Sequence, residues 1–333
     1  MERAWKAGFK DLLKAGLNPK ITRKIIEQKQ KIHPRRQFEI IQKHNLKITT
    51  LKDKNYPRLL KEIHDPPPVL YYKGRLPRPH ETLIAIIGTR KPTTYGKHVT
   101  QILTRELASR GISIVSGLAL GIDAIAHKTC LNSNQTTYAV LSCGLDRVYP
   151  GQNSKLAQRI LKTGGLISPY PPGWPPLKYT FYARNRIISG LCPGVLITQA
   201  ALRSGTSITA NHALDQNRDI FAVPGEIYAP QSQGCNKLIK QGAKLITSFQ
   251  DIFEELKIPN SLKQKDKKSS EQALAMSPAQ KIILKLLSLR PIPFDKLVYL
   301  TKLEIDVLLS NLTELEIQGL IEKIDEKYFL NKN

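Results

Sequence analysis

The sequence predicts an α/β fold built on a parallel sheet that helices cover on both faces. Its apolar runs are uninterrupted, as in strands buried on both faces, and helical patterns such as Val99, Ile102, Leu103 and Leu107 separate them. Arg110-Gly111 supplies a helix stop before the second strand. The five predicted strands are Leu83–Ile87, Ile112–Val115, Tyr138–Leu141, Val195–Ile197 and Ile220–Val223.

Segments of different composition flank this α/β domain, which we place at residues 83–256. Residues 1–55 predict a small helical module with short amphipathic helices. Prolines 57, 66, 67 and 68 predict an extended connector over 56–82, lying across the surface of the next domain. A polar, lysine-rich tract predicts a flexible linker over 257–276.

Residues 277–333 show the element order of a winged helix-turn-helix. Helices are predicted at Pro278–Leu289, Phe294–Leu300 and Glu304–Gln318, followed by a strand or wing over Lys323–Leu330. The third helix of such a module normally enters the DNA major groove. Here that helix contains four acids and no Lys or Arg, so it would repel phosphates. We therefore favour a packing or partner-binding role over DNA reading.

The charge distribution points to a polyanionic partner. The chain has a formal net charge of +24; residues 1–81 and 82–250 each carry +12, and residues 251–333 are neutral. Such an excess is typical of proteins that bind nucleic acid. For the N-terminal part, a merely solvated or non-specifically sticky surface explains the lysines equally well.

Residues suited to phosphate binding follow the predicted strands. Gly88 lets the backbone approach a phosphate, Thr89 offers a hydroxyl, and Arg90 offers a fork of donors. The carboxyl ends of parallel strands point at one crevice, so loops distant in sequence can meet there. The same combination of a glycine with a hydroxyl side chain recurs at Ser116-Gly117 and at Ser204-Gly205-Thr206.

The last of these segments opens a helix. Free N–H groups and the positive end of the helix dipole favour an anion at that position. An ordinary N-cap, with Ser204 or Thr206 as the capping residue, is an equally good explanation.

A stretch of nine residues mixes cations with aromatic rings. Single-stranded nucleic acid exposes a backbone that cations can follow and bases that can stack on rings. Arg184 and Arg186 are candidate phosphate contacts, and Asn185 could bond a base edge or fix the loop. Phe181 could instead be a core ring. The cations and rings are Lys178, Tyr179, Phe181, Tyr182, Arg184 and Arg186.

Several other classes of protein lack support in the sequence. There is no GxxxxGK[ST] phosphate loop, no GxGxxG fingerprint, no HExxH and no Cys/His cluster. We predict neither cofactor nor metal, and we assign four scattered cysteines to reduced thiols without a role. His127 has no visible catalytic partner and is predicted to be structural. No apolar run approaches a membrane span, and the charged N-terminus predicts a cytoplasmic protein.

Taken together, these motifs resemble the DNA-processing protein A family, also called DprA or Smf. The likeness covers nearly 200 consecutive residues with many motifs in order. It is carried by 65–74 (DPPPVLYYKG), 86–96 (IIGTRKPTTYG), 115–127 (VSGLALGIDAIAH), 181–191 (FYARNRIISGL), 201–210 (ALRSGTSITA) and 221–243 (FAVPG…GCNKLIKQGA).

The resemblance implies a Rossmann-like core, with a SAM/HhH-like N-terminal module and a C-terminal winged-helix domain. It implies a bacterial protein that binds single-stranded DNA, protects incoming strands in natural transformation and loads the RecA recombinase. It also implies a homodimer formed through the Rossmann-like domain. By the same resemblance, Gly88-Thr89-Arg90 line the DNA pocket.

Two alternatives stay open, a nucleotide-hydrolysing enzyme of the phosphoribohydrolase type and a general polyanion binder. The enzyme shares the strand-loop plan but needs carboxylates, and the acids between residues 82 and 250 form no recognisable catalytic pair. Where related sequences often have an acid, this chain has Ser168-Pro169-Tyr170-Pro171 and Gln199. Both changes favour a non-enzymatic protein, and both leave the local loop geometry open.

Overall fold

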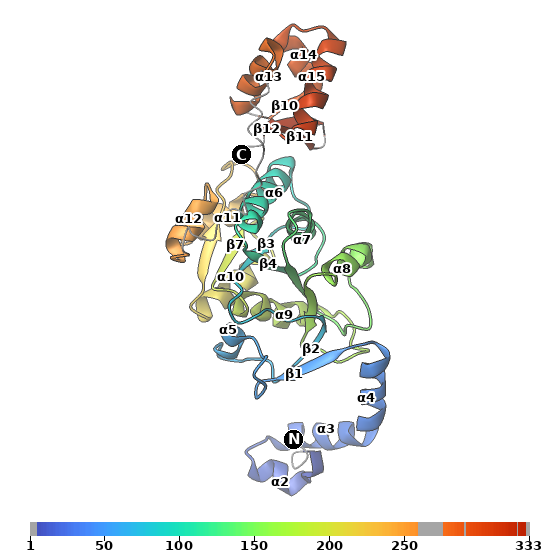
Figure 1. The fold of residues 1–333 in the computed structure, drawn as a ribbon. Coiled ribbons are helices and arrows are strands. Elements are labelled where there is room, and N and C mark those ends of the chain that lie inside the picture. The colour runs from blue at the N-terminus through green and yellow to red at the C-terminus, as the bar shows by residue number, and fades with distance from the viewer. Residues whose placement is uncertain (1–4, 259–275, 290, 325, 331–333) are drawn as a thin grey trace.

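The computed structural model describes residues 5–258, 276–289, 291–324 and 326–330. Its centre is a nine-stranded sheet in the order β1-β2-β6-β5-β4-β3-β7-β8-β9 (Figure 1). From β6 to β9 every neighbouring pair is parallel, whereas β2 is antiparallel to β6 and β1 is antiparallel to β2. The strands are β1 (Lys47–Thr50), β2 (Val69–Gly74), β3 (Leu83–Ile87), β4 (Ser113–Ser116), β5 (Thr137–Val140), β6 (Gly165–Ser168), β7 (Gly194–Ile197), β8 (Asp219–Ala222) and β9 (Lys244–Leu245).

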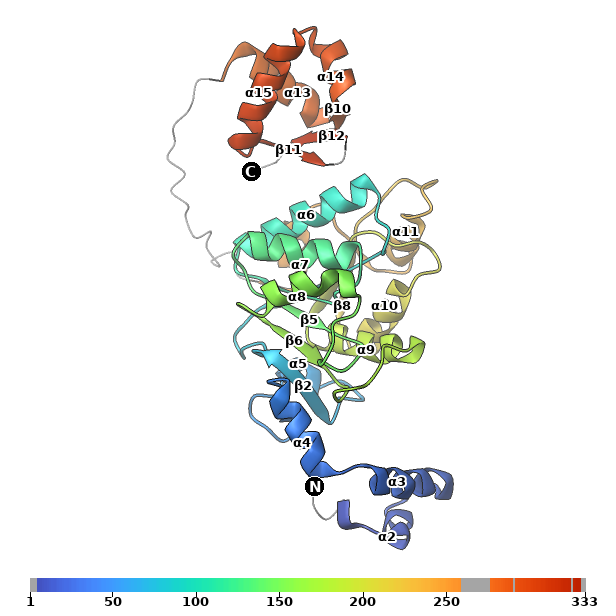
Figure 2. The same cartoon turned by 90° about the vertical axis from the view of Figure 1, so that its right-hand side faces the viewer.

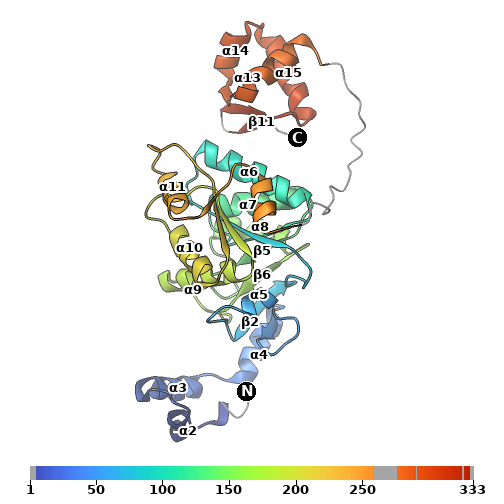
Figure 3. The same cartoon turned by 90° about the vertical axis from the view of Figure 1, so that its left-hand side faces the viewer.

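Helices cover both faces of the sheet (Figures 2 and 3). Side chains alternate between the two cores: Ile84 and Ile86 of β3 face one, and Ala85 faces the other. This double burial is the reason that the strands are apolar at every position. One face carries α6 (Thr94–Ser109), α7 (Ile122–Asn132), α8 (Ser154–Ile160, after the 3₁₀ turn Gly151–Asn153) and α12 (Phe249–Glu255); the other carries α5 (Arg58–Lys61), α9 (Lys178–Gly190), α10 (Thr206–Asp215) and α11 (Gln233–Lys240).

The predicted fold class is confirmed, with the five expected strands present within one residue at each end. Strand β6 was not predicted. Its only large apolar residues are Leu166 and Ile167, which Gly165 and Ser168 flank, so it offers no apolar run long enough to mark a strand. Strand β9 escaped prediction for the same reason, since it has two residues, Lys244 and Leu245.

The segment expected to be a surface connector over 56–82 instead supplies part of the sheet. Strand β2 pairs with β6, and Leu70 at its centre has no exposed surface. The Tyr56 hydroxyl donates to the Pro67 carbonyl at 2.7 Å, which ties the proline run to the buried start of the segment. Strand β2 itself contains no proline, so its N–H groups are free to pair.

The expected N-terminal helical module contains α2 (Phe9–Lys14), α3 (Pro19–Lys31) and α4 (Pro34–Lys43), but its last residues form β1 of the central sheet. In Figure 1 these helices extend beyond the β1 edge of the sheet. Apolar side chains on α3 and α4 are substantially exposed, among them Ile21 and Phe38.

The C-terminal winged-helix domain has its own core, which includes Ile283, Leu297 and Leu312. It touches the α/β domain at α6, where the His98 and Phe329 rings lie 3.8 Å apart and Arg105 pairs with Glu322 at 2.9 Å. The expected linker falls mostly outside the described residues. The elements are α13 (Pro278–Leu289), β10 (Ile292–Pro293), α14 (Phe294–Thr301), α15 (Ile305–Ile317), β11 (Ile321–Ile324) and β12 (Lys327–Leu330).

In the part of the chain that the structure describes, no helix is long and apolar enough to cross a membrane. The same residues contain no group of three or more His, Cys, Asp or Glu side chains placed to hold a metal ion. All four cysteines are buried free thiols.

Because β2 is part of the core, truncating an aliphatic side chain on β2 should lower the free energy of unfolding more than truncating one on β1. Leu70→Ala should lower the free energy of unfolding by about 2–5 kcal/mol, because it leaves a cavity in the core. Ile48→Ala on neighbouring β1 removes a side chain that is 39% exposed, so it should cost roughly 1 kcal/mol or less. Urea denaturation measures both, and equal costs would contradict the placement of β2.

Candidate functional site

A cleft of about 510 Å³ opens at the carboxyl end of β3. The chain moves from β3 outward through β4, β5 and β6, then returns to place β7 on the other side of β3. Such a reversal of strand order leaves a crevice at the carboxyl ends, where open α/β sheets bind ligands. We call this cleft the switch-point crevice. Its walls come from the loop after β3, helix α9 and the start of α10.

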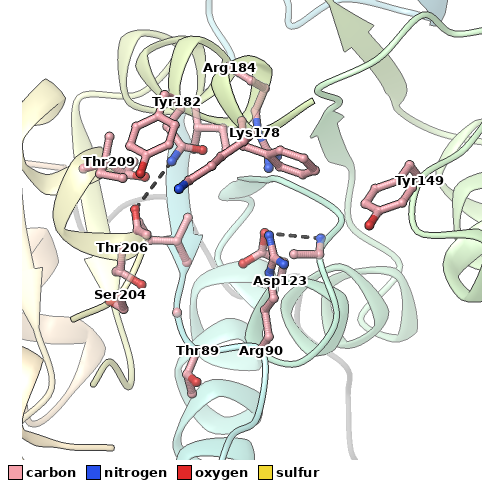
Figure 4. Close-up of a pocket in the computed structure, with 18 residues that line it drawn as sticks. Thr89, Arg90, Asp123, Tyr149, Lys178, Tyr182, Arg184, Ser204, Thr206 and Thr209 are labelled. Atoms are coloured by element: carbon pink, nitrogen blue, oxygen red, sulfur yellow. Dashed lines mark hydrogen bonds between the residues drawn. The ribbon is translucent and has the colours of Figure 1, made fainter. Parts of the chain in front are cut away.

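Ten of the thirteen predicted site residues line the switch-point crevice. Figure 4 shows Arg90 from the loop after β3, and Lys178 and Arg184 from α9, directed toward one space. The ten are Gly88, Thr89, Arg90, Lys178, Phe181, Arg184, Asn185, Ser204, Gly205 and Thr206; the structure keeps Ser116, Gly117 and Arg186 out of its lining.

The loop after β3 is held by packing and by backbone bonds. A Cβ on Gly88 would lie 2.6 Å from Ile122 Cγ1, so this glycine permits close packing on α7. The Thr89 N–H donates to the Gln199 carbonyl at 2.8 Å. The Gln199 side chain bonds the backbone and hydroxyl of Thr93 at 2.9 and 2.8 Å. An uncharged amide therefore holds this loop.

Arg90 and Phe181 form one wall of the crevice. Arg90 is exposed, and its guanidinium carbon lies 5.5 Å from the centre of the Phe181 ring. Phe181 is partly exposed and meets Tyr149 edge-on, with 5.8 Å between ring centres. The ring is thus a crevice wall and not a buried core residue. Its position leaves aromatic surface and a cation side by side.

Helix α9 changes the interpretation of the mixed cationic and aromatic stretch. We expected Arg184-Asn185-Arg186 in a loop, but all three lie inside a helix of thirteen residues. Helical spacing places Lys178, Phe181, Tyr182 and Asn185 on the crevice side. Arg186 points elsewhere and pairs with Asp65 at 3.1 Å. It is therefore not a crevice residue.

Arg184 lines the crevice but is only 4% exposed. Its Nη1 donates to the Val140 carbonyl at 2.7 Å, and its Nε is buried without a partner among the described residues. Burial lowers the pKa of Arg184 to about 10, so the side chain stays charged at neutral pH. This arginine supplies positive potential from inside the wall, in contrast to the exposed contact predicted from the sequence.

The residues after β4 support Arg184 instead of facing a ligand. A Cβ on Gly117 would overlap the Arg184 guanidinium, which explains the glycine. The Gly117 N–H donates to Asp123 Oδ2 at 3.0 Å, and the Ser116 hydroxyl donates to the Ile86 carbonyl at 2.6 Å. Both predicted phosphate donors are therefore already used within the fold.

Asp123 is the one carboxylate among the residues that line the crevice. Burial raises the pKa of this carboxyl, while the nearby Arg184 charge and the N–H groups of Gly117 and Ala119 oppose the rise. The acid lies in the first turn of α7. Its placement offsets part of the Arg184 charge at the base of the crevice.

Two helix N-termini meet at the crevice, those of α9 and α10. Neither helix has an acid in its first turn, and Lys178 is the first residue of α9. No side-chain cap bond closes α10, so the capping explanation for Ser204 and Thr206 is not confirmed. The Ser204 hydroxyl is buried without a partner among the described residues. This end of α10 retains donors and a positive dipole for an anion.

Sequence reasoning missed Tyr149 and Thr209 as crevice residues. Tyr149 precedes Pro150 and Gly151 in the loop after β5, and an aromatic residue between a strand end and a turn was the available signal. Thr209 lies one helical turn beyond Ser204-Gly205-Thr206, so the period of α10 could have revealed it.

His127 is buried behind the crevice and takes no part in its lining. The Thr137 hydroxyl donates to the Ile114 carbonyl at 2.7 Å, so Nδ1 of His127 must donate to that hydroxyl, also at 2.7 Å. Burial and the Arg184 charge lower the pKa of His127 to about 3. The neutral imidazole is part of the core, as the sequence indicated.

Fold and site together define a doubly wound α/β protein with an electropositive, aromatic-lined crevice at its switch point. The family model for DNA recombination-mediator protein A matches residues 47–257, and the DprA winged helix domain model matches residues 266–325. The chain belongs to the DNA recombination-mediator protein A (DprA/Smf) family. The resemblance that the sequence motifs suggested is thereby confirmed.

Individual relatives agree with this assignment. Protein Smf from Synechocystis is 36% identical over 97% of this chain and 90% of the relative, and DprA from Bacillus subtilis is 46% identical over 62% and 70%. The crystal structure of Streptococcus pneumoniae DprA matches 72% of this chain and 82% of that chain with a TM-score of 0.66 and 39% identity. A Helicobacter pylori DprA structure, described for its single-stranded DNA binding mode, has a TM-score of 0.56 and 36% identity, covering 64% of this chain and 97% of that chain.

A first prediction concerns acid stability. The unfolded chain protonates His127 near pH 6.5, whereas the folded chain does so only near pH 3. Stability should therefore fall as pH falls through that window, by up to about 1.4 kcal/mol per pH unit. Urea unfolding should show a flatter pH dependence for His127→Asn than for wild type. His33→Asn, at an exposed position, should keep the wild-type slope; equal slopes for all three proteins would contradict this burial.

A second prediction separates the two crevice arginines by their effect on stability. Arg184→Ala removes a buried cation and leaves the Val140 carbonyl and Asp123 without it, so it should cost roughly 2 kcal/mol or more. Arg90→Ala removes an exposed side chain and should change stability by about 0.5 kcal/mol or less. Thermal and urea unfolding measure both changes in the free energy of unfolding. If Arg184→Ala costs no more than Arg90→Ala, the buried contacts of Arg184 do not stabilise the fold.

Proposed function

We propose that this protein binds single-stranded DNA in the switch-point crevice. The observation that carries the proposal is the joint presence of Arg90, Lys178 and the rings of Tyr149, Phe181 and Tyr182 around one cleft. Cations that follow a phosphate backbone, next to rings on which bases stack, are the recurring features of single-strand binding sites.

The balance of charge in the crevice supports an anionic ligand. Arg90, Lys178 and Arg184 line it with a single carboxylate, Asp123. The unpartnered Ser204 hydroxyl and the N-terminus of α10 add donors at the opposite wall. Thr89 and Asn185 add uncharged polar groups to the same lining. We propose that these predicted residues contact the strand, with Tyr149 and Tyr182 added to them.

The relatives extend the proposal beyond binding. The matching family is described as a recombination-mediator, and a similar Helicobacter pylori structure is described for its single-stranded DNA binding mode. We propose that this chain protects incoming strands and loads the RecA recombinase during natural transformation, without bond chemistry of its own, as a cytoplasmic homodimer. The recombinase step is checked by RecA filament formation on strands coated with single-strand-binding protein, which added protein should accelerate.

One observation favours the alternative, a nucleotide-hydrolysing enzyme. Asp123 lines the crevice and burial raises its pKa, as in many catalytic acids. Its Oδ2, however, accepts the Gly117 N–H at 3.0 Å and the Ala119 N–H at 3.4 Å. A second carboxylate, which hydrolysis of a glycosidic bond would use, is missing from the residues that line the crevice. Release of a base or phosphate from a panel of nucleotides would support the enzyme.

The proposal predicts the effect of Arg90→Ala/Lys178→Ala on binding of a labelled poly-dT strand. Affinity falls as salt rises, and removing one cation that binds a phosphate should make the slope of log affinity against log salt shallower by about 0.7. The double variant should therefore show a slope that is shallower by roughly 1.4. Fluorescence anisotropy across a salt series measures this. Lys237→Ala/Lys240→Ala on α11 removes the same charge from exposed positions outside the crevice and should keep the wild-type slope.

An equal-length duplex provides the second arm of this experiment. Wild type should prefer the single strand, because a duplex does not expose base faces to the rings. If both DNAs bind alike and both variants behave alike, the net charge of the chain acts diffusely and the crevice serves another ligand.

A further inference from the structure

We propose that a second basic groove, between α7 and α8, carries the phosphates of the same strand after it leaves the switch-point crevice. This inference rests on the proposed single-strand function and adds a direction to the DNA path. The groove is a cavity of about 310 Å³ on the face of the sheet that α6, α7 and α8 cover. We call it the α7–α8 groove.

The charged residues that line the α7–α8 groove are all basic. Lys128 comes from α7, and Lys155 and Arg159 come from α8. The latter two are four residues apart, so they lie on one side of the helix. All three side chains are exposed, and Gln152 adds an uncharged polar group beside them. Cations from two separate helices thus converge on one groove with no carboxylate among its lining residues.

These cations have no carboxylate partner within the described part of the chain. Arg159 Nη2 donates to Asn132 Oδ1 at 2.8 Å, which orients the guanidinium without neutralising it. Lys128 and Lys155 form no ion pair with a described residue. Like charges held together repel one another, and a polyanion relieves that repulsion as it releases its counterions.

The α7–α8 groove shares a wall with the switch-point crevice. Asn153 lines the groove and is 8% exposed. Its Nδ2 donates to the carbonyl of Leu118 at 2.8 Å and to that of Ala119 at 3.3 Å, and Ala119 lines the crevice. Tyr149, on the same loop as Asn153, also lines the crevice. A strand that stacks a base near Tyr149 therefore reaches Lys155 by crossing a single loop.

The residues that line the two cavities differ in a way that fits one continuous strand. The crevice offers rings together with cations, whereas the α7–α8 groove offers cations over a partly buried apolar floor of Ile125 and Leu156. The first suits a base with its phosphate, and the second suits phosphates alone. Sequence-independent binding of a longer strand follows from this division.

The test compares strand lengths in Lys128→Ala/Lys155→Ala. A poly-dT strand of about 5 nucleotides fills the crevice alone, and one of about 30 also covers the groove. The variant should bind the short strand within about twofold of wild type. For the long strand, the affinity of the variant should fall about tenfold at low salt, and its slope of log affinity against log salt should become shallower by roughly 1.4. Lys237→Ala/Lys240→Ala is the matched control, and an unchanged melting temperature confirms folding.

Each remaining outcome overturns a defined part of the account. Wild-type affinity of the variant for the long strand overturns the α7–α8 groove and leaves the crevice intact. An equal loss of affinity for both lengths, or an equal loss for a duplex, replaces the groove with a general polyanion surface. A wild-type protein that binds neither strand overturns the proposed function and this inference together.

Discussion

The buried guanidinium of Arg184 joins the elements on which the crevice depends. It extends from α9, bonds the Val140 carbonyl of β5, packs against Gly117 and lies near Asp123 of α7. A cation with so little exposure needs such partners, since desolvation is costly. The same contacts fix the relative positions of α9, the loop after β4 and the start of α7. They also place a permanent positive charge behind the aromatic wall, where water does not screen it well.

The sequence was sufficient for the fold class because doubly buried strands are apolar at every position, as in Leu83–Ile87. It was insufficient for β2, which follows a proline run and is only partly buried, and for β6, which has only two large apolar residues, Leu166 and Ile167. Most crevice residues were also predictable, since strand ends converge by topology alone. The side chain directions of Arg184 and Arg186 were not, because a loop was assumed where a helix sends them to different sides.

The winged-helix domain adds a neutral-to-acidic element to a basic protein. Helix α15 contains no cation, and one of its acids, Glu314, accepts the Gln280 amide at 2.8 Å. The wing side of the domain meets α6 through the His98–Phe329 contact (Figure 2). The packing or partner-binding role expected for α15 stays a prediction. No described residue of the domain lines the switch-point crevice, so the domain leaves the crevice open to a ligand.

The most direct test of the account is photo-crosslinking of an iododeoxyuridine-substituted single strand, with the attached peptides identified by mass spectrometry. Stacking of bases in the switch-point crevice predicts adducts at Tyr149, Phe181 or Tyr182, and their disappearance when unlabelled poly-dT competes. Adducts confined to the N-terminal helices α2–α4, with the crevice rings unmodified, would contradict it.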